Sequence, residues 1–380
     1  MLSVFLENRN ELPVFHSLFN KITEKNSALK KATNPYTTPV FCLYDFPSYL
    51  IPNYNESKWA VKTVNSFEGS MIILKNYKDT TDYLNTNFSS SRRSKFKTYR
   101  RRLEKVFSIS YKAYYGNISE NEFNTLFSEF HKLIEKRFVE KKIKNYDLTR
   151  WEVYTKIALP LIRNKEAVLF VIYDKNKPIS ICLNLIRDEV IYGYVRAYDI
   201  DYSKYYLGFT DFIKQLEWCY DNNIKVFDLL KGKYEYKSRL IDDNYIFQKH
   251  IIYQKNNFWA KLRGISLFLK ISSFYKIIGI LKKLKFDYLY HLILKYKYRN
   301  TVTSNKLHYL LEQLNNPTII TQTRQIDFTN ERYNFLKRPV YDALYKVQEE
   351  LDCIEVHQHL SDKNAYFIKS SNTITKITLS

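Results

Sequence analysis

Val190-Ile-Tyr-Gly-Tyr-Val-Arg-Ala-Tyr198 begins the stretch of sequence that decides the fold, and its β-branched and aromatic residues predict a strand. From Gly208 onward the apolar residues recur on one stripe, which predicts a helix. The apolar run at 224–230 is too short for a helix and predicts a second strand. Two strands joined by a helix of this length are expected to be parallel neighbours with a right-handed crossover.

The loop that enters this helix is a predicted anion site. The first backbone N–H groups of a helix have no partner within the helix, and the helix dipole is positive at that end. Lys204, just ahead of Gly208, adds a positive charge. A second basic loop, rich in tyrosine, follows the second strand as Lys231-Gly-Lys-Tyr-Glu-Tyr-Lys237.

Three pieces of the chain resemble one enzyme family, in the family's order. Asp199-Ile-Asp-Tyr-Ser-Lys-Tyr-Tyr-Leu-Gly208 with Phe227-Asp-Leu-Leu-Lys-Gly-Lys-Tyr-Glu-Tyr-Lys237 is similar to the signature of the CelD/BcsL-type acyltransferases. Ser91-Arg-Arg-Ser-Lys-Phe-Lys-Thr-Tyr-Arg-Arg-Arg-Leu-Glu-Lys105 resembles the arginine-rich helix that opens the family's domain, and Phe130-His131 with Arg137 is a further match. These enzymes belong to the GNAT superfamily and are relatives of the Fem peptidoglycan aminoacyl transferases.

The turn into the helix departs from the family. The family usually has Ser-Pro-Gly there, whereas Tyr206 and Leu207 precede Gly208 in this chain. The phosphate loop of the wider superfamily is represented only by Gly208.

The order of the predicted elements agrees with the fold that the resemblance implies. Helices at 119–140 and 148–162 come before three meandering strands within 166–198, and a helix and another strand follow. We therefore expect a mixed α/β (α+β) chain with the GNAT acyltransferase fold, in which helices flank a mixed central sheet. An N-terminal GNAT-like or partial half and a basic helical C-terminal extension complete the expected architecture.

Four segments are expected. Residues 1–88 form an N-terminal α/β subdomain with short strands at 39–43, 59–64 and 70–74, and residues 89–257 form the GNAT-like domain. Residues 258–300 form a basic amphipathic helical segment, and residues 301–380 form a small C-terminal α/β appendage.

The resemblance implies direct acyl transfer from an acyl-CoA, acetyl-CoA first among them, with no metal. An amine or hydroxyl of a sugar, a polysaccharide precursor or another cell-envelope-related acceptor would attack the thioester carbonyl, backbone N–H groups would stabilise the oxyanion, and a base and an acid would move the protons. The cofactor is expected where the two parallel strands splay. Its binding residues would be Lys204, Tyr206, Leu207, Gly208, Phe209 and Thr210.

The predicted catalytic residues are Asp228, Tyr236, Lys237 and His131. Asp228 interrupts an apolar strand, and a structural carboxylate that caps a turn or pairs with Lys237 is an equal alternative. Tyr236 is a candidate general acid, and Lys237 a candidate anchor for an anionic donor or acceptor. For His131, which the helical pattern places on an apolar face, a core histidine is favoured over a base.

Five further residues are predicted to bind a substrate or an anion. Arg196 lies in a strand that should be mostly buried and needs either a structural carboxylate or the substrate as its partner. The others are Arg100, Arg101, Lys231 and Lys233.

Positive charge is concentrated in two segments. The chain carries a formal charge of +21, and residues 92–105 have eight Lys or Arg against one Glu. Residues 258–300 have ten against one Asp, together with several aromatic residues. Such density favours an anionic partner over a merely solvated face, and for 258–300 we expect either an anionic membrane surface or packing on the catalytic domain. A membrane span is not expected there, because Lys270 and Lys276 would each cost about 3 kcal/mol near the bilayer centre.

Compartment and cofactor class follow from smaller features. The four cysteines are scattered, which excludes a disulfide scaffold or the paired spacing of a zinc site and indicates a reducing cytoplasm. The first seven residues lack the pattern of a signal peptide. A cytoplasmic protein, in contact with the inner membrane face through 258–300, is the expectation.

Two alternatives to the acyl-CoA enzyme stay open. A Fem-like transferase would take an aminoacyl group from tRNA, with the helix at Arg100 and Arg101 as an RNA contact. A catalytically silent GNAT-like protein that binds membrane or RNA is the other, because Ser-Pro is missing before Gly208.

Overall fold

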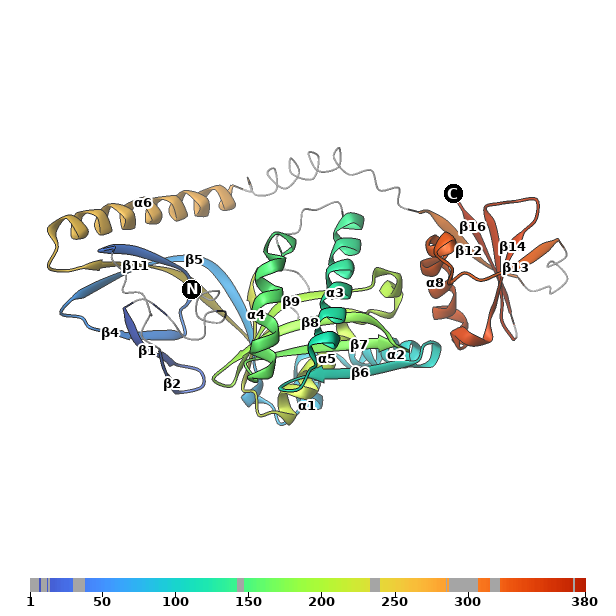
Figure 1. Ribbon diagram of the computed structural model, residues 1–380, viewed down its shortest axis with the longest axis horizontal. Coiled ribbons are helices and arrows are strands. Elements are labelled where there is room, and N and C mark those ends of the chain that lie inside the picture. Colours follow the sequence, from blue (N-terminus) through green and yellow to red (C-terminus); the bar gives the residue numbers. More distant parts are fainter. Residues whose placement is uncertain are drawn as a thin grey trace.

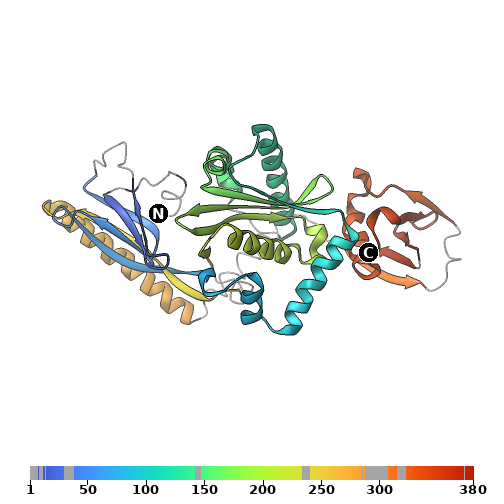
Figure 2. The same cartoon turned by 90° about the horizontal axis from the view of Figure 1, so that it is seen from below.

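The computed structural model describes residues 7, 12, 14–29, 38–141, 147–232, 240–284, 286, 307–314, 322–371 and 373–380. These residues form three sheets with helices around them. The chain is a mixed α/β protein whose large central sheet is flanked by helices on both faces (Figures 1 and 2).

The central sheet has eight strands in the order β3-β11-β5-β10-β9-β8-β7-β6. All neighbours are antiparallel except β9 and β10, which are parallel. The bounds are β3 Val40–Pro47, β5 Trp59–Ile73, β6 Ile109–Tyr114, β7 Ala167–Asp174, β8 Lys177–Arg187, β9 Val190–Tyr198, β10 Val226–Lys231 and β11 Asp243–Gln254.

Helices cover both faces of the half that contains β6 to β10. On one face α3 (Glu120–Lys141) and α4 (Trp151–Arg163, after the 3-10 turn η3, Leu148–Arg150) pack their buried stripes on the sheet (Figure 1). On the other face lie α1 (Thr80–Asn87, after η2, Leu74–Asn76), α2 (Ser90–Val106) and α5 (Leu207–Asp221, after η4, Ile200–Tyr205). Strands covered on both faces read as continuous apolar runs, and all of residues 167–172 are buried accordingly.

The other half of the central sheet carries a small sheet and one long helix. Strands β1 (Phe15–Asn20), β2 (Lys25–Ala28) and β4 (Leu50–Tyr54) form a three-stranded antiparallel sheet. Helix α6 (Phe258–Lys283) lies along β5 and β11 (Figure 1). Within the described part of the chain, α6 is the one helix long and apolar enough to cross a membrane by length and composition alone.

A third unit follows at the C-terminal end. Strands β12 (Tyr309–Leu314), β13 (Thr323–Ile326), β14 (Glu355–His359), β15 (Ala365–Lys369) and β16 (Ile374–Leu379) form an antiparallel sheet in the order β12-β16-β15-β14-β13. Helix α8 (Lys337–Val347), between η7 (Glu331–Leu336) and η8 (Leu351–Cys353), packs on η4 and α2 of the central unit in one shared hydrophobic cluster.

The predicted strands, helices and crossover unit of residues 119–254 agree with the structure in type and order. Two expectations need correction. The boundary at residue 88 does not separate two units, because β3 and β5 belong to the same sheet as β6 to β11. Separate strands predicted at 59–64 and 70–74 are one continuous strand, β5, which passes through Gly69.

Candidate active site

The parallel strands β9 and β10 separate after a short paired region. Their register runs from Val226 opposite Val190 to Asp228 opposite Tyr192 and ends there. Strand β9 continues to Tyr198, and no described strand pairs with residues 193–198 on the β10 side. A wedge therefore opens between the carboxyl ends of two parallel strands, the place where open α/β sheets bind ligands.

Asp228 lies at the point of this wedge and is completely buried. Its carboxylate accepts hydrogen bonds from the hydroxyls of Tyr49 at 2.7 Å and Tyr245 at 2.8 Å. It also accepts one from the backbone N–H of Leu230 at 2.7 Å, and Leu230 has a left-handed backbone with φ of 57°. This local turn ends the pairing of β10 with β9 and interrupts its register with β5. The contacts agree with the alternative in which Asp228 is a structural carboxylate that caps a turn.

Two tyrosines hold Asp228, and a glycine makes one of these contacts possible. A Cβ atom on Gly69 would lie 2.3 Å from Cζ of Tyr245, so only glycine lets that ring cross β5 to reach the carboxylate. The pKa values of Tyr49 and Tyr245 are raised well above the ordinary value, first because both hydroxyls are buried and second because the carboxylate of Asp228 lies beside them. These hydroxyls therefore remain protonated donors at neutral pH.

A β-bulge lies in β9 beside the wedge. Asn184 of β8 is opposite Gly193, whereas Leu183 is opposite Val195, so Tyr194 is the extra residue. A bulge twists its strand and turns backbone groups out of the regular ladder, and bulges are frequent beside active sites. The bulge thus lies within residues 193–198, the part of β9 with which no described strand pairs on the β10 side.

Helix α5 begins at the same end of the sheet. Tyr206 precedes it in a left-handed conformation with φ of 51°, and half of its side chain is exposed. Phe209 stacks on Phe96 at a centroid distance of 3.8 Å, and Tyr206 stacks on Tyr99 at 4.2 Å, so α2 fixes the first turn of α5. A Cβ on Gly208 would contact Tyr198 at 3.4 Å.

The predicted cofactor residues are therefore neighbours in space as well as in sequence. Leu207 and Thr210 are buried, Lys204 is exposed, and Gly208 and Phe209 are half-buried. The first hydrogen bonds of α5 run from the N–H groups of Phe209 and Thr210 to the carbonyl of Tyr206. The N–H groups of Leu207 and Gly208 come earlier in the chain and therefore have no acceptor within the helix.

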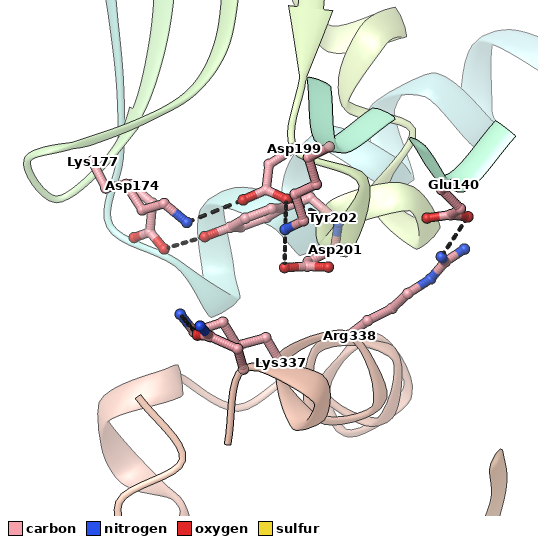
Figure 3. A network of polar contacts seen from close by, with 10 residues as sticks. Glu140, Asp174, Lys177, Asp199, Asp201, Tyr202, Lys337 and Arg338 are labelled. Carbon is pink, nitrogen blue, oxygen red and sulfur yellow. Dashed lines mark hydrogen bonds and ion pairs between the residues drawn. The ribbon is translucent and has the colours of Figure 1, made fainter. Parts of the chain in front are cut away.

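A charged cluster holds η4, which leads into α5 (Figure 3). Lys136 of α3 contacts Asp199 at 2.6 Å and Asp201 at 2.5 Å, and Lys177 contacts Asp199 at 3.0 Å. Asp199 is almost fully buried, and the two lysines lower its pKa against the effect of burial. The carboxylate is then charged at neutral pH and ties α3, the β7–β8 turn and η4 together.

Helix α8 of the C-terminal unit closes over this cluster (Figure 3). The Tyr205 hydroxyl donates to the carbonyl of Tyr341 at 3.0 Å, and Arg338 pairs with Glu140 of α3 at 2.8 Å. The C-terminal unit thus contacts the loop that positions the first turn of α5.

Arg137 is a residue at this end of the sheet that the predicted set did not include. Its guanidinium lies 4.4 Å from the ring centre of Tyr198, the same ring that contacts Gly208. Its Nε atom is buried and has no hydrogen-bond partner among the described residues. A buried donor without an acceptor is costly, which marks Arg137 as a position where an anion can bind. The family resemblance at Arg137 was the sequence signal for it.

Arg196 is paired with a structural carboxylate. Its Nε lies 3.2 Å from Asp211 of α5, which is buried. Gln215 donates to the same carboxylate at 2.8 Å and accepts from Asn184 of β8 at 2.7 Å. The structure therefore favours the structural alternative for Arg196, in a polar chain that joins α5 to β8 and β9.

The remaining cationic candidates occupy other positions. Arg100 pairs with Glu104 at 2.8 Å and with Glu217 of α5 at 3.5 Å, whereas Arg101 is exposed. Lys231, at the end of β10, pairs with Asp45. Only Arg101 of these three presents its charge to solvent without a described acidic partner.

His131 does not join the wedge. Its ring lies 5.3 Å from that of Trp151, and Nδ1 is 3.3 Å from Glu135, so its described contacts are with α3 and α4. The side chain is about one-third exposed, which corrects the expectation of an apolar surrounding. The predicted residues Tyr236, Lys237 and Lys233 lie outside the described residues. Among those described, no group of acidic, histidine and cysteine side chains has the arrangement of a metal site.

Part of the central unit is similar to a known protein family. Residues 90–238 match the family model described as acetyltransferase (GNAT) domain. No curated protein is similar enough to this sequence to count as a match.

Three solved structures show limited similarity. FemX shares 10% identity over 53% of this chain and 65% of its own, with a TM-score of 0.38. A conserved protein of unknown function from Bacteroides thetaiotaomicron shares 11% over 53% and 64%, with a TM-score of 0.35. The C-terminal domain of a proposed lysylphosphatidylglycerol synthetase from Agrobacterium fabrum shares 7% over 55% and 65%, with a TM-score of 0.36. The chain thus spans 64–65% of the length of these structures.

The matched residues run from α2 through β10 and contain the crossover unit, the bulge and the first turn of α5. This part of the chain is therefore similar in sequence to acetyltransferase domains of the GNAT type.

Proposed function

We propose that the protein transfers an acyl group from an acyl-CoA, acetyl-CoA first among them, directly to an amine or hydroxyl of a saccharide or another cell-envelope-related acceptor. The proposal places the enzyme in the cytoplasm. The observation that carries it is the wedge between β9 and β10, with a bulge on one side and the first turn of α5 at its mouth.

The part of the β9 edge with which no described strand pairs suits the arm of coenzyme A. That arm is extended and contains two amide groups, and residues 193–198 have backbone groups on the β10 side that no described strand uses. An extended ligand that adds to a free strand edge gains main-chain hydrogen bonds. The thioester would then lie near the bulge at Tyr194, where backbone N–H groups leave the ladder.

The cationic and N–H groups at the mouth suit a pyrophosphate. The first turn of α5 offers the N–H groups of Leu207 and Gly208, and the positive end of the helix dipole favours an anion there. Lys204 is exposed beside this turn, and Arg137 adds a buried Nε that has no described acceptor. Two independent features thus support an anionic ligand at one end of the wedge.

In this proposal Asp228 is a positioning residue. Its oxygens already accept from two tyrosine hydroxyls and one backbone N–H, which leaves little capacity to accept a proton from an acceptor amine. Its role is to hold Leu230 in the turn that opens the wedge. The acceptor class rests on the resemblance of residues 199–208 and 227–237 to the CelD/BcsL-type signature, and Tyr236 and Lys237 remain the proposed acid and anion anchor.

Calorimetric titration with acetyl-CoA and coenzyme A tests the donor. We expect saturable binding that a Gly208→Trp substitution weakens, because the indole would occupy the space beside Tyr198 at the mouth of the wedge. Gly279→Trp is the matched control, since a Cβ there meets nothing within 4 Å.

Arg137→Gln separates phosphate binding from general damage. We expect it to weaken coenzyme A more than pantetheine, which lacks the nucleotide phosphates. No binding of either ligand, together with salt-sensitive binding of tRNA, would reject the acyl-CoA proposal in favour of the tRNA-dependent alternative.

A further inference from the structure

Helix α6 has two apolar faces, and only one of them is covered. At 100° per residue, Ala260, Gly264, Phe268, Ile271 and Tyr275 fall on one side of the helix. This side packs on β5 and β11 (Figure 1). Because apolar residues lie on opposite sides of α6, the helix lacks the simple amphipathic pattern expected for residues 258–300.

The inner face is packed closely. A Cβ on Gly264 would lie 2.4 Å from the ring of Tyr253, so β11 and α6 approach at the distance that glycine permits. Lys62 of β5 lies 5.0 Å above the Phe268 ring, and Phe67 packs edge-on against Tyr275 at 5.7 Å. These contacts attach α6 to the central sheet along most of its length.

The outer face is apolar and exposed. Seven large apolar side chains fall within an arc of about 100° that points away from the sheet. Their exposed fractions lie between 46% and 73%: Phe258, Trp259, Leu262, Leu269, Ile277, Ile280 and Leu284. Soluble proteins seldom expose so long an apolar strip, and one of this kind marks an interaction surface.

Basic residues border this strip. On the same helical projection Arg263 and Lys270 lie on one flank, Lys261 and Lys283 on the other, and Lys276 at its edge. Residues 258–283 contain six Lys or Arg and no Asp or Glu. An apolar strip with Trp and Phe at one end and cations along both sides has the composition of helices that lie in the interface of an anionic bilayer.

We propose that the outer face of α6 binds the surface of an anionic membrane, with the helix axis parallel to the bilayer plane. The cations on both flanks, with no acidic residue among them, argue against a second copy of α6 as the occupant, because two such strips would bring like charges together. The inner contacts with β5 and β11 argue against a span, since a spanning α6 would have to leave the sheet and bury Lys270 and Lys276 in hydrocarbon. This proposal does not depend on the acyl donor.

Vesicle flotation of the full-length protein tests the proposal. Vesicles of phosphatidylcholine mixed with phosphatidylglycerol are compared with phosphatidylcholine alone, at low and high salt. We expect binding to the anionic vesicles that weakens with salt. The Trp259→Ser/Leu269→Ser/Ile277→Ser variant should lose more than about tenfold in partition coefficient, since three exposed apolar side chains are removed.

A matched control uses exposed leucines far from α6. Leu310 and Leu360 are 72% and 63% exposed in the C-terminal unit, so Leu310→Ser/Leu360→Ser should keep full vesicle binding. In a separate measurement, the fluorescence of Trp259 is obtained by subtracting the emission spectrum of Trp259→Phe from that of the wild-type protein. This difference spectrum should shift to the blue when anionic vesicles are added.

Three results would overturn the proposal. One is equal vesicle binding by the triple variant and the control. Another is concentration-dependent dimerisation that the triple variant abolishes while neither protein floats with vesicles, which would assign the face to a second copy. The third is resistance of the membrane-bound protein to alkaline extraction, which would assign α6 to a span.

Discussion

Removal of the Asp228 carboxylate should destabilise the central sheet far more than its replacement by an amide. Asp228→Ala leaves two buried tyrosine hydroxyls and the partly buried N–H of Leu230 without their acceptor. Each such donor costs about 1–3 kcal/mol, and partial rearrangement gives a loss of roughly 3–5 kcal/mol in the free energy of unfolding. For a unit of about 200 residues this corresponds to a fall of about 10 °C in Tm.

Asp228→Asn keeps an oxygen that can accept from Leu230, and a tyrosine hydroxyl can turn to accept from the amide. We expect a loss of only about 1–2 kcal/mol, with the turn at Leu230 and therefore the wedge retained. The assay is thermal unfolding followed by far-UV circular dichroism, together with acetyl-CoA titration of each variant at a temperature where it is folded.

The two variants distinguish a positioning residue from a base. A positioning role predicts that Asp228→Asn binds acetyl-CoA and turns over near the wild-type rate. If Asp228→Asn unfolded at the wild-type temperature but lost turnover by several orders of magnitude, the carboxylate would be the catalytic base and the structural reasoning would be refuted.

Three other changes have expected outcomes. Burial lowers the pKa of His250 to about 4, so the unfolded chain takes up a proton between pH 6.5 and 4 that the folded chain does not. Stability should therefore fall by up to about 3 kcal/mol as pH drops through that window, and His250→Phe should remove this component in urea unfolding at several pH values. Asp211→Ala leaves the partly exposed Arg196 without its carboxylate and should cost about 2–3 kcal/mol, whereas adding Arg196→Leu should restore part of the loss, measured as a double-mutant cycle. Gly264→Ala should lower Tm because its Cβ meets a ring of β11, and Gly279→Ala should raise stability by up to about 1 kcal/mol, because it removes a glycine from open helix surface.

The crossover unit was predictable because its information is local. The strand at 190–198, the helix from Gly208 and the strand after 224 each have a periodicity or length that excludes the other element type. The resemblance implied that the two strands splay, but the contacts at the point of the wedge were not predictable, because Tyr49 and Tyr245 come from other parts of the chain and meet Asp228 only in the folded sheet.

The separate strands expected at 59–64 and 70–74 were the other main error. Gly69 lies between these ranges, and in the structure it marks the close approach of the Tyr245 ring across β5. The paired state of Arg196 was left open for a similar reason: Asp211 is one of several carboxylates in the sequence, and only the packing of α5 on β9 selects it.

Strand β5 connects the wedge between β9 and β10 with helix α6. It runs unbroken through 15 residues, contacts α6 through Phe67 and pairs Met71 with Asp228. The ring of Phe67 lies against both Tyr275 of α6 and the ammonium group of Lys231 at the end of β10. From Lys62 to Met71 the strand spans about 30 Å. The register of β5 with β11 shifts between Asn65 and Glu68, so the strand bends beside Phe67 but is paired with β11 on both sides of the bend. If α6 lies on a membrane as proposed above, β5 links the wedge to that membrane, and acceptors would be selected by their distance from the membrane as well as by their chemistry.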